Sequence, residues 1–179
     1  MVTLLIFQIV GGETMKKRVL ALVMMLVLAI GMVACGAESE GTFVYEAPEG
    51  FEWDEEEQCY YGPDGMANIL YSNIENDGSF KSVTKAMLEE SFEETYSQSF
   101  GEDIDITITS WKETTVDGYD AVLYGLEYEY SGIALLQMQI MINGTDYIHY
   151  VTFTDMQDSE YADDFEACVS TMKFEPVQE

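Results

Sequence analysis

The sequence predicts an α+β fold, with one antiparallel β-sheet sandwiched between helices in an α/β/α arrangement. Polar and apolar residues alternate along several consecutive segments in the second half of the chain, and short turn motifs join them. Two other segments repeat apolar residues at helical spacing. Helices of this kind bury their apolar stripes against a sheet, which gives the layered arrangement.

The early part of the domain is expected to contain short strands. The first lies at residues 42–45, and residues 51–53 continue an edge of the sheet. A hairpin then joins strands at 58–61 and 66–74 through Gly62-Pro63-Asp64-Gly65, whose residues favour a tight turn.

The first helix is expected at residues 82–99, capped by Ser79 or Ser82. A second helix is expected at 159–172, with Asp158 as its cap and Lys173 near its end, where a cation suits the helix dipole. The apolar stripe of the first helix is Val83, Met87, Phe92, Tyr96 and Phe100; that of the second is Tyr161, Phe165, Cys168, Val169 and Met172.

Four strands are expected between these helices. Residues 103–111 alternate isoleucine with polar residues, and residues 116–119 turn the chain. Residues 121–130 follow, and residues 133–142 are apolar on nearly both faces, as in a central strand. Asn143-Gly144 predicts a two-residue hairpin turn leading into residues 147–154.

The N-terminal segment predicts export and lipid attachment. Residues 15–34 combine Met15-Lys16-Lys17-Arg18 with an apolar run too short for a comfortable bilayer span. Small residues then precede Cys35, which resembles the signal peptide and lipobox of bacterial lipoproteins. That resemblance implies cleavage before Cys35, lipid on its thiol and a location on the outer face of the cytoplasmic membrane. Residues 1–14 are interpreted as an over-extended start, 35–41 as a tether and 42–179 as one domain.

The charge of the exported part excludes some partners. From residue 35 onward the chain keeps four lysines, no arginine and 33 acidic residues, a net charge of −29. Nucleic acids require cationic residues to neutralise phosphate, so no nucleic-acid partner is expected. The charge favours cationic ligands or calcium, or serves only as a solvated acidic surface.

Cysteine and histidine are sparse. Cys59 and Cys168 are interpreted either as an extracytoplasmic disulfide or as two buried free thiols. His149 is the sole histidine, and no nucleophile-elbow motif accompanies it, so a structural role is expected. The residues Asn73–Thr84 begin like an EF-hand loop but lack its final glutamate, and no metal site is assigned.

One strand carries a candidate ligand platform. Tyr124, Tyr128 and Tyr130 share a face of residues 121–130, and Glu127 and Glu129 lie on the opposite face. If a helix covers the tyrosines they belong to the core; if they are uncovered, tyrosines among carboxylates suit cationic ligands.

Several short motifs resemble the PsbP-like superfamily. They are Ala47–Phe51 after the first strand, Gly118–Ala121 before the long strands, Tyr147–Thr152, and the closing segment Phe165–Phe174. The resemblance spans most of residues 42–174 and implies an α/β/α sandwich with binding or assembly roles rather than catalysis. Because none of these motifs is catalytic, no functional residue is transferred.

The sequence therefore predicts a non-enzymatic, membrane-anchored extracytoplasmic module that binds an envelope protein partner and requires no cofactor. The alternative is a binding protein for a cationic ligand or a divalent metal such as calcium. An envelope hydrolase has only scattered carboxylates in its favour.

Overall fold

A seven-stranded antiparallel sheet forms the centre of the computed structural model, which describes residues 41–101, 103–156 and 161–177. The order of the strands across the sheet is β2-β3-β4-β8-β7-β6-β5, and β1 and β9 pair separately as a two-stranded ribbon. The strands are β1 (Gly41–Val44), β2 (Glu52–Asp54), β3 (Cys59–Tyr61), β4 (Asn68–Glu75), β5 (Thr107–Val116), β6 (Tyr119–Tyr130), β7 (Ile133–Asn143), β8 (Tyr147–Met156) and β9 (Lys173–Pro176).

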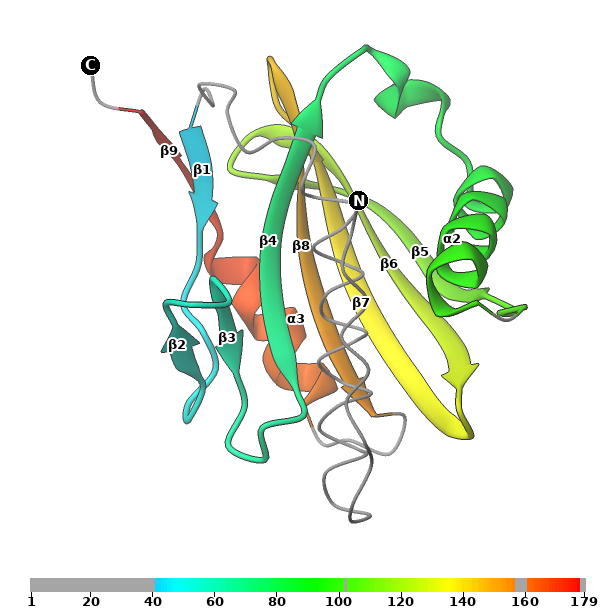
Figure 1. Cartoon of the computed structure of the whole chain (residues 1–179). Helices are drawn as coiled ribbons and strands as arrows, with labels where there is room; N and C mark the ends of the chain where they lie inside the picture. The colour runs from blue at the N-terminus through cyan, green and yellow to red at the C-terminus, as the bar shows by residue number, and fades with distance from the viewer. Residues whose placement is uncertain (1–40, 102, 157–160, 178–179) are drawn as a thin grey trace, which may run out of the picture.

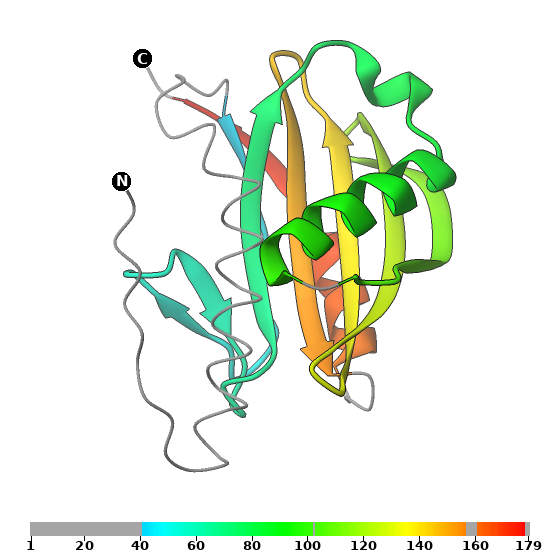
Figure 2. The same cartoon turned by 45° about the vertical axis from the view of Figure 1, so that its right-hand side comes forward.

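Helices cover both faces of this sheet (Figures 1 and 2). Helix α2 (Lys85–Phe100) lies across one face, and helix α3 (Ala162–Thr171) lies on the other with the β1–β9 ribbon. Each face has its own apolar core, so the predicted α/β/α sandwich is confirmed. Within the described residues, no helix is long and apolar enough to cross a bilayer.

Two glycine-containing turns set the register of the long strands. Val116 pairs with Tyr119 and Tyr130 pairs with Ile133, which leaves two residues in each turn. In both turns the two residues have positive φ angles, as a type I′ turn requires. The turn predicted at 116–119 is therefore confirmed. The predicted two-residue turn at Asn143-Gly144 is wrong, because Asn143 pairs with Ile148 and leaves four residues in the connection.

Helix α2 begins later than expected. A 3₁₀ turn occupies Ser79–Ser82, and the side chain of Thr84 accepts a hydrogen bond from the Met87 amide at 3.3 Å, so Thr84 is the N-cap. The helix also packs through Leu88 rather than Met87, which is 53% exposed. The residues that pack on the sheet are spaced four apart, Leu88, Phe92, Tyr96 and Phe100, and Met87 lies one residue off this row, about 100° around the helix.

The segment 103–106, directly before β5, belongs to no strand. The Ile104 amide donates to Ser97 Oγ at 2.9 Å, and the Ile106 amide donates to Glu93 Oε1 at 3.4 Å. Helix side chains thus take the place of a neighbouring strand. The strand predicted at 103–111 is therefore displaced to Thr107–Val116.

The second helix buries the predicted stripe. Phe165, Cys168 and Met172 are buried, and Tyr161 and Val169 pack against the same core. The expected cap, Asp158, lies outside the described residues.

The β1–β9 ribbon joins the two ends of the domain. Gly41 pairs with Pro176 and Phe43 pairs with Phe174. The ring of Phe43 lies 5.1 Å from His149 and 5.5 Å from Tyr119, so the ribbon is held against the sheet by aromatic packing. This pairing was not predicted from the sequence, because β9 is short and its partner lies at the opposite end of the chain.

Candidate functional site

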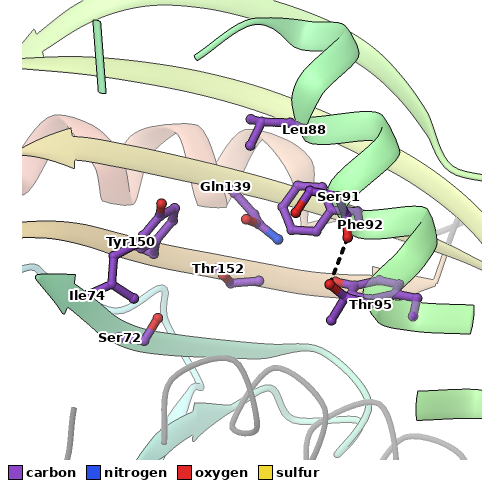
Figure 3. A pocket seen from close by; sticks show the side chains of 10 residues that line it. Ser72, Ile74, Leu88, Ser91, Phe92, Thr95, Gln139, Tyr150 and Thr152 are labelled. Carbon is purple, nitrogen blue, oxygen red and sulfur yellow. Dashed lines mark hydrogen bonds between the residues drawn. The ribbon is translucent and has the colours of Figure 1, made fainter. Parts of the chain in front are cut away.

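A groove opens between helix α2 and strands β4 and β8 (Figure 3). Its volume is about 190 Å³. It is lined by Ser72, Ile74, Leu88, Ser91, Phe92, Thr95, Tyr96, Gln139, Tyr150 and Thr152.

The two periodicities of helix and strand bring these residues together. Helix positions three and four apart share one face, so Leu88, Ser91 and Thr95 line one wall of the groove. Strand positions two apart share one face, so Tyr150 and Thr152 of β8 form part of the floor. Figure 3 shows the helix side chains across the gap from those of the strands.

A hydrogen-bonded network of amides and hydroxyls lies beneath the groove. The hydroxyl of Tyr124 donates to Gln139 Oε1 at 2.8 Å, and Gln139 Nε2 donates to Gln137 Oε1 at 3.1 Å. Gln137 Oε1 also accepts from the Tyr96 hydroxyl at 2.9 Å, and its Nε2 donates to Thr154 at 3.1 Å. This network occupies both polar atoms of each glutamine side chain and fixes the floor of the groove.

The lining of the groove carries no charge at neutral pH. It contains hydroxyls, one carboxamide and apolar groups, and no acidic or basic side chain. Its two titratable groups are Tyr96 and Tyr150. Burial holds the pKa of Tyr96 well above its usual range, and burial and the nearby charge of Asp77 raise the pKa of Tyr150 to about 12. The groove therefore suits neutral, partly apolar groups that form hydrogen bonds.

His149 lies on the opposite side of the sheet. Its Nδ1 is 2.6 Å from the hydroxyl of Tyr71, and the rings of Phe43 and Phe174 pack against it. Because successive strand residues face opposite ways, His149 and the hydroxyls of the groove are on different faces. The imidazole cannot activate a groove serine, and its buried aromatic setting is that of a structural residue.

The three tyrosines of the candidate ligand platform belong to the core beneath α2. Tyr124 is fully buried and Tyr128 is 5% exposed, both beneath α2. The ring of Tyr130 stacks on Phe100 at 4.0 Å. Of the two alternatives left open by the sequence, the structure contains the core, since the apolar stripe of the helix covers the tyrosines.

The two glutamates of the same strand lie on its other face. Glu129 is exposed and Glu127 is partly buried, and both point away from the tyrosine side chains. The structure does not bring the five residues into one site, although the alternation predicted along β6 is correct.

The cysteines are separated in the structure. Cys59 and Cys168 are free and buried: Cys59 packs with Leu70, whereas Cys168 belongs to the α3 core and donates to the Glu46 carbonyl at 3.0 Å. Burial raises the pKa of Cys59 to about 11 and that of Cys168 to about 12. Of the two alternatives, the structure contains the free thiols. Cys35 lies outside the described residues.

Among the residues of the described ranges, no group of three acidic, histidine or cysteine side chains is arranged to hold a metal ion. The EF-hand-like segment contains the end of β4, a turn and the 3₁₀ helix Ser79–Ser82. In the turn, Asn76 Oδ1 accepts from the Gly78 amide and Asp77 Oδ1 accepts from the Ser79 amide. The Oδ1 atoms of Asn76 and Asp77 are therefore already bound to the backbone amides of Gly78 and Ser79.

Sequence reasoning missed Gln137 and Gln139. A signal was present, because two glutamines two positions apart interrupt an otherwise apolar strand, Leu135–Met141. Buried polar side chains require hydrogen-bond partners, so such a pair indicates a polar network on one face of a central strand.

Three solved structures share this arrangement of helices and sheet. Each has a TM-score of 0.51 and is matched over 79% of this chain. The first is PA94 from Pseudomonas aeruginosa, a protein of unknown function and putative regulator, with 13% identity and 89% of its length covered. The others are a cyanobacterial PsbP from Synechocystis (12% identity, 98% covered) and LpqN from Mycobacterium tuberculosis (11% identity, 88% covered).

The chain has a PsbP-like fold. Neither a family model nor a curated protein matches the sequence. At these low identities the likeness extends to the PsbP-like fold alone.

Proposed function

We propose that this PsbP-like domain is a non-catalytic binding module, held at the outer face of a bacterial cytoplasmic membrane by a lipid on Cys35. In this proposal translation starts at Met15, residues 15–34 are removed, and residues 35–41 tether the domain. The partner is another envelope protein, and a segment of it enters the groove beside α2.

The uncharged lining of the groove carries the binding role. General acid–base catalysis at neutral pH needs a group whose pKa lies near the working pH. The lining offers hydroxyls, an amide already engaged on both atoms, and two tyrosines whose pKa values are raised, that of Tyr150 to about 12. Ile74, Leu88 and Phe92 supply apolar contacts, and the hydroxyls suit the backbone of a bound polypeptide.

The extracytoplasmic placement is supported by the signal-like sequence before Cys35. It is also supported by LpqN, which shares the fold and is described as involved in cell envelope biogenesis. Two or three acyl chains on one cysteine would hold the domain without help from its acidic surface, because each buried CH₂ contributes about 0.8 kcal/mol.

In-cell photo-crosslinking tests the binding role. A photoreactive residue replaces Ser91 at the groove or, as the control, its exposed neighbour Glu90. We expect one dominant envelope protein to be captured from position 91 but not from position 90. A Thr152→Leu substitution, which adds apolar bulk to the floor, should reduce that capture at least fivefold. Equal capture from both positions, unchanged by Thr152→Leu, would contradict the proposal.

The anchor is tested separately with Cys35→Ala. We expect the wild-type chain to incorporate labelled palmitate and to sediment with membranes, and the variant to do neither. Lipid labelling that persists in the variant would disprove Cys35 as the attachment site and leave the binding role to the crosslinking result.

A further inference from the structure

A second surface lies at the end of the sheet farthest from β5. Strands β2 and β3 form a hairpin that projects beyond β4, away from α2 (Figure 2). Trp53 on β2 is 47% exposed. In the described part of the chain, the other large apolar side chains with comparable exposure are Met87 and Val177. An exposed tryptophan is unusual, and tryptophan is enriched among the residues that dominate binding energies.

Two partly buried tyrosines lie behind the exposed Trp53. Trp53 pairs with Tyr60 across the hairpin, and their rings lie 5.0 Å apart at 63°. The ring of Tyr45 lies 5.9 Å from Tyr60. We call Tyr45, Trp53 and Tyr60 the aromatic edge. Tyr45 and Tyr60 pack against the core beneath α3, so the aromatic edge is continuous with that core.

The segment that carries the aromatic edge contains charges of one sign, and Lys173 of β9 is the lysine that pairs beside it, opposite Val44. Residues 41–80 contain ten acidic residues and no lysine or arginine. Glu52, Glu55 and Glu56 are exposed beside Trp53 in the sequence, and the one ion pair formed within the described residues, Lys85–Glu89, lies elsewhere.

The loop that carries these carboxylates is fixed by its own side chains. Asp54 Oδ1 accepts from the amides of Glu56 and Glu57 at 2.8 and 2.9 Å. Gln58 Nε2 donates to the Glu55 carbonyl at 2.7 Å. The hairpin therefore presents its aromatic and acidic groups in one arrangement, which lowers the entropy lost when a partner binds.

We propose that the aromatic edge binds a lysine- or arginine-bearing segment of a partner protein. A cation over the indole of Trp53 is attracted by the ring, and the neighbouring carboxylates attract the same charge. The acidic residues favour a cationic partner segment. They would repel an acidic segment, and a purely apolar segment would leave their charges without a partner. This surface is distinct from the groove, so either can fail without the other.

The test uses the purified lipoprotein in a non-ionic detergent. Trp111→Phe leaves Trp53 as the single tryptophan reporter. The probes are a twelve-residue peptide of alternating lysine and threonine and its glutamate counterpart. We expect saturable change of Trp53 fluorescence with the lysine peptide, weakened by salt, and none with the glutamate peptide. Absence of saturation at 50 mM salt and 1 mM lysine peptide, or equal response to both peptides, would overturn the proposal.

Matched variants separate a site from general charge attraction. Glu55→Gln with Glu56→Gln should raise the dissociation constant at least fivefold, and Glu90→Gln with Glu94→Gln on α2, an equal change in charge, less than twofold. Trp53→Ala, followed by calorimetry, should also weaken binding at least fivefold, whereas Met87→Ala should not. Equal losses in the two glutamate pairs, or no loss in Trp53→Ala, would refute a specific aromatic surface and leave the groove proposal intact.

Discussion

The carboxylate of Glu89 accepts a hydrogen bond of 2.9 Å from the backbone amide of Ile108, and this bond joins helix α2 directly to β5. Glu93 and Ser97 repeat this contact with Ile106 and Ile104. Four helix residues rise about 6.0 Å and two extended residues about 6.6 Å, so the two series keep in step. Because β5 is at the end of the sheet, these contacts also cover amides that would otherwise invite another strand.

Glu89→Ala should lower the free energy of unfolding by about 1–3 kcal/mol, because the buried amide of Ile108 loses its acceptor. Urea unfolding measures the change. Lys85→Ala is the control, since Lys85 is exposed and its Nζ lies 3.8 Å from the partly buried carboxylate of Glu89. Lys85→Ala should lower the free energy of unfolding by less than about 0.5 kcal/mol. Equal effects would mean that the ion pair, not the amide contact, gives Glu89 its importance.

Gln137→Leu should destabilise the domain by about 2–4 kcal/mol, because Tyr96, Gln139 and Thr154 each lose a hydrogen-bond partner. Met138→Leu is the neighbouring control on the other face and should change stability by less than about 1.5 kcal/mol. Thermal and urea unfolding provide the comparison. A nearly neutral Gln137→Leu would show that water or local repacking satisfies the network.

The two thiols should resist a thiol reagent at pH 8 and react once the chain is unfolded. Cys59 and Cys168 are buried, and their pKa values are raised to about 11 and 12. With lipid on Cys35, the unfolded chain should give two reactive thiols without reductant. If the unfolded chain has no reactive thiol before reduction, Cys59 and Cys168 form a disulfide. If it has three reactive thiols, Cys35 is unmodified.

Tyr150 should make stability fall in alkali. Its pKa is about 12 in the folded chain and 10.0 ordinarily, so the folded state favours the neutral phenol. The contribution of the neutral Tyr150 phenol to the free energy of unfolding is complete below pH 10 and is lost as the pH rises toward 12. Between pH 8 and pH 11 the wild type should lose about 1 kcal/mol more than Tyr150→Phe. Parallel pH profiles of the two proteins in urea unfolding would argue against this role.

Local patterns predicted most of the sheet and both helices. The alternation along β6 and the stripe of α3 each depend on near neighbours in the sequence, and both are confirmed. The start of α2 was wrong because three hydroxyl-bearing residues, Ser79, Ser82 and Thr84, are similar candidates for the cap. Which of them caps the helix depends on where the preceding 3₁₀ turn ends.

The candidate site was harder to predict than the fold. Whether Tyr124 and Tyr128 bind ligand or form core depends on where α2 crosses the sheet, which is a tertiary fact. The groove likewise exists because α2 leaves part of β4 and β8 uncovered. Trp53 is exposed because its strand is at the end of the sheet, and the sequence of residues 51–61 does not specify that order.

The pairing of β1 with β9 also determines when the domain can be completed. Strand β1 can pair only after β9 has been synthesised, because Phe43 pairs with Phe174 and all the other strands lie between them in the sequence. Such a contact closes the longest loop in the domain and is expected to form late. A chain exported from its N-terminus would therefore emerge with β1 unpaired, and cleavage after α3 would strip Phe43 and His149 of their cover.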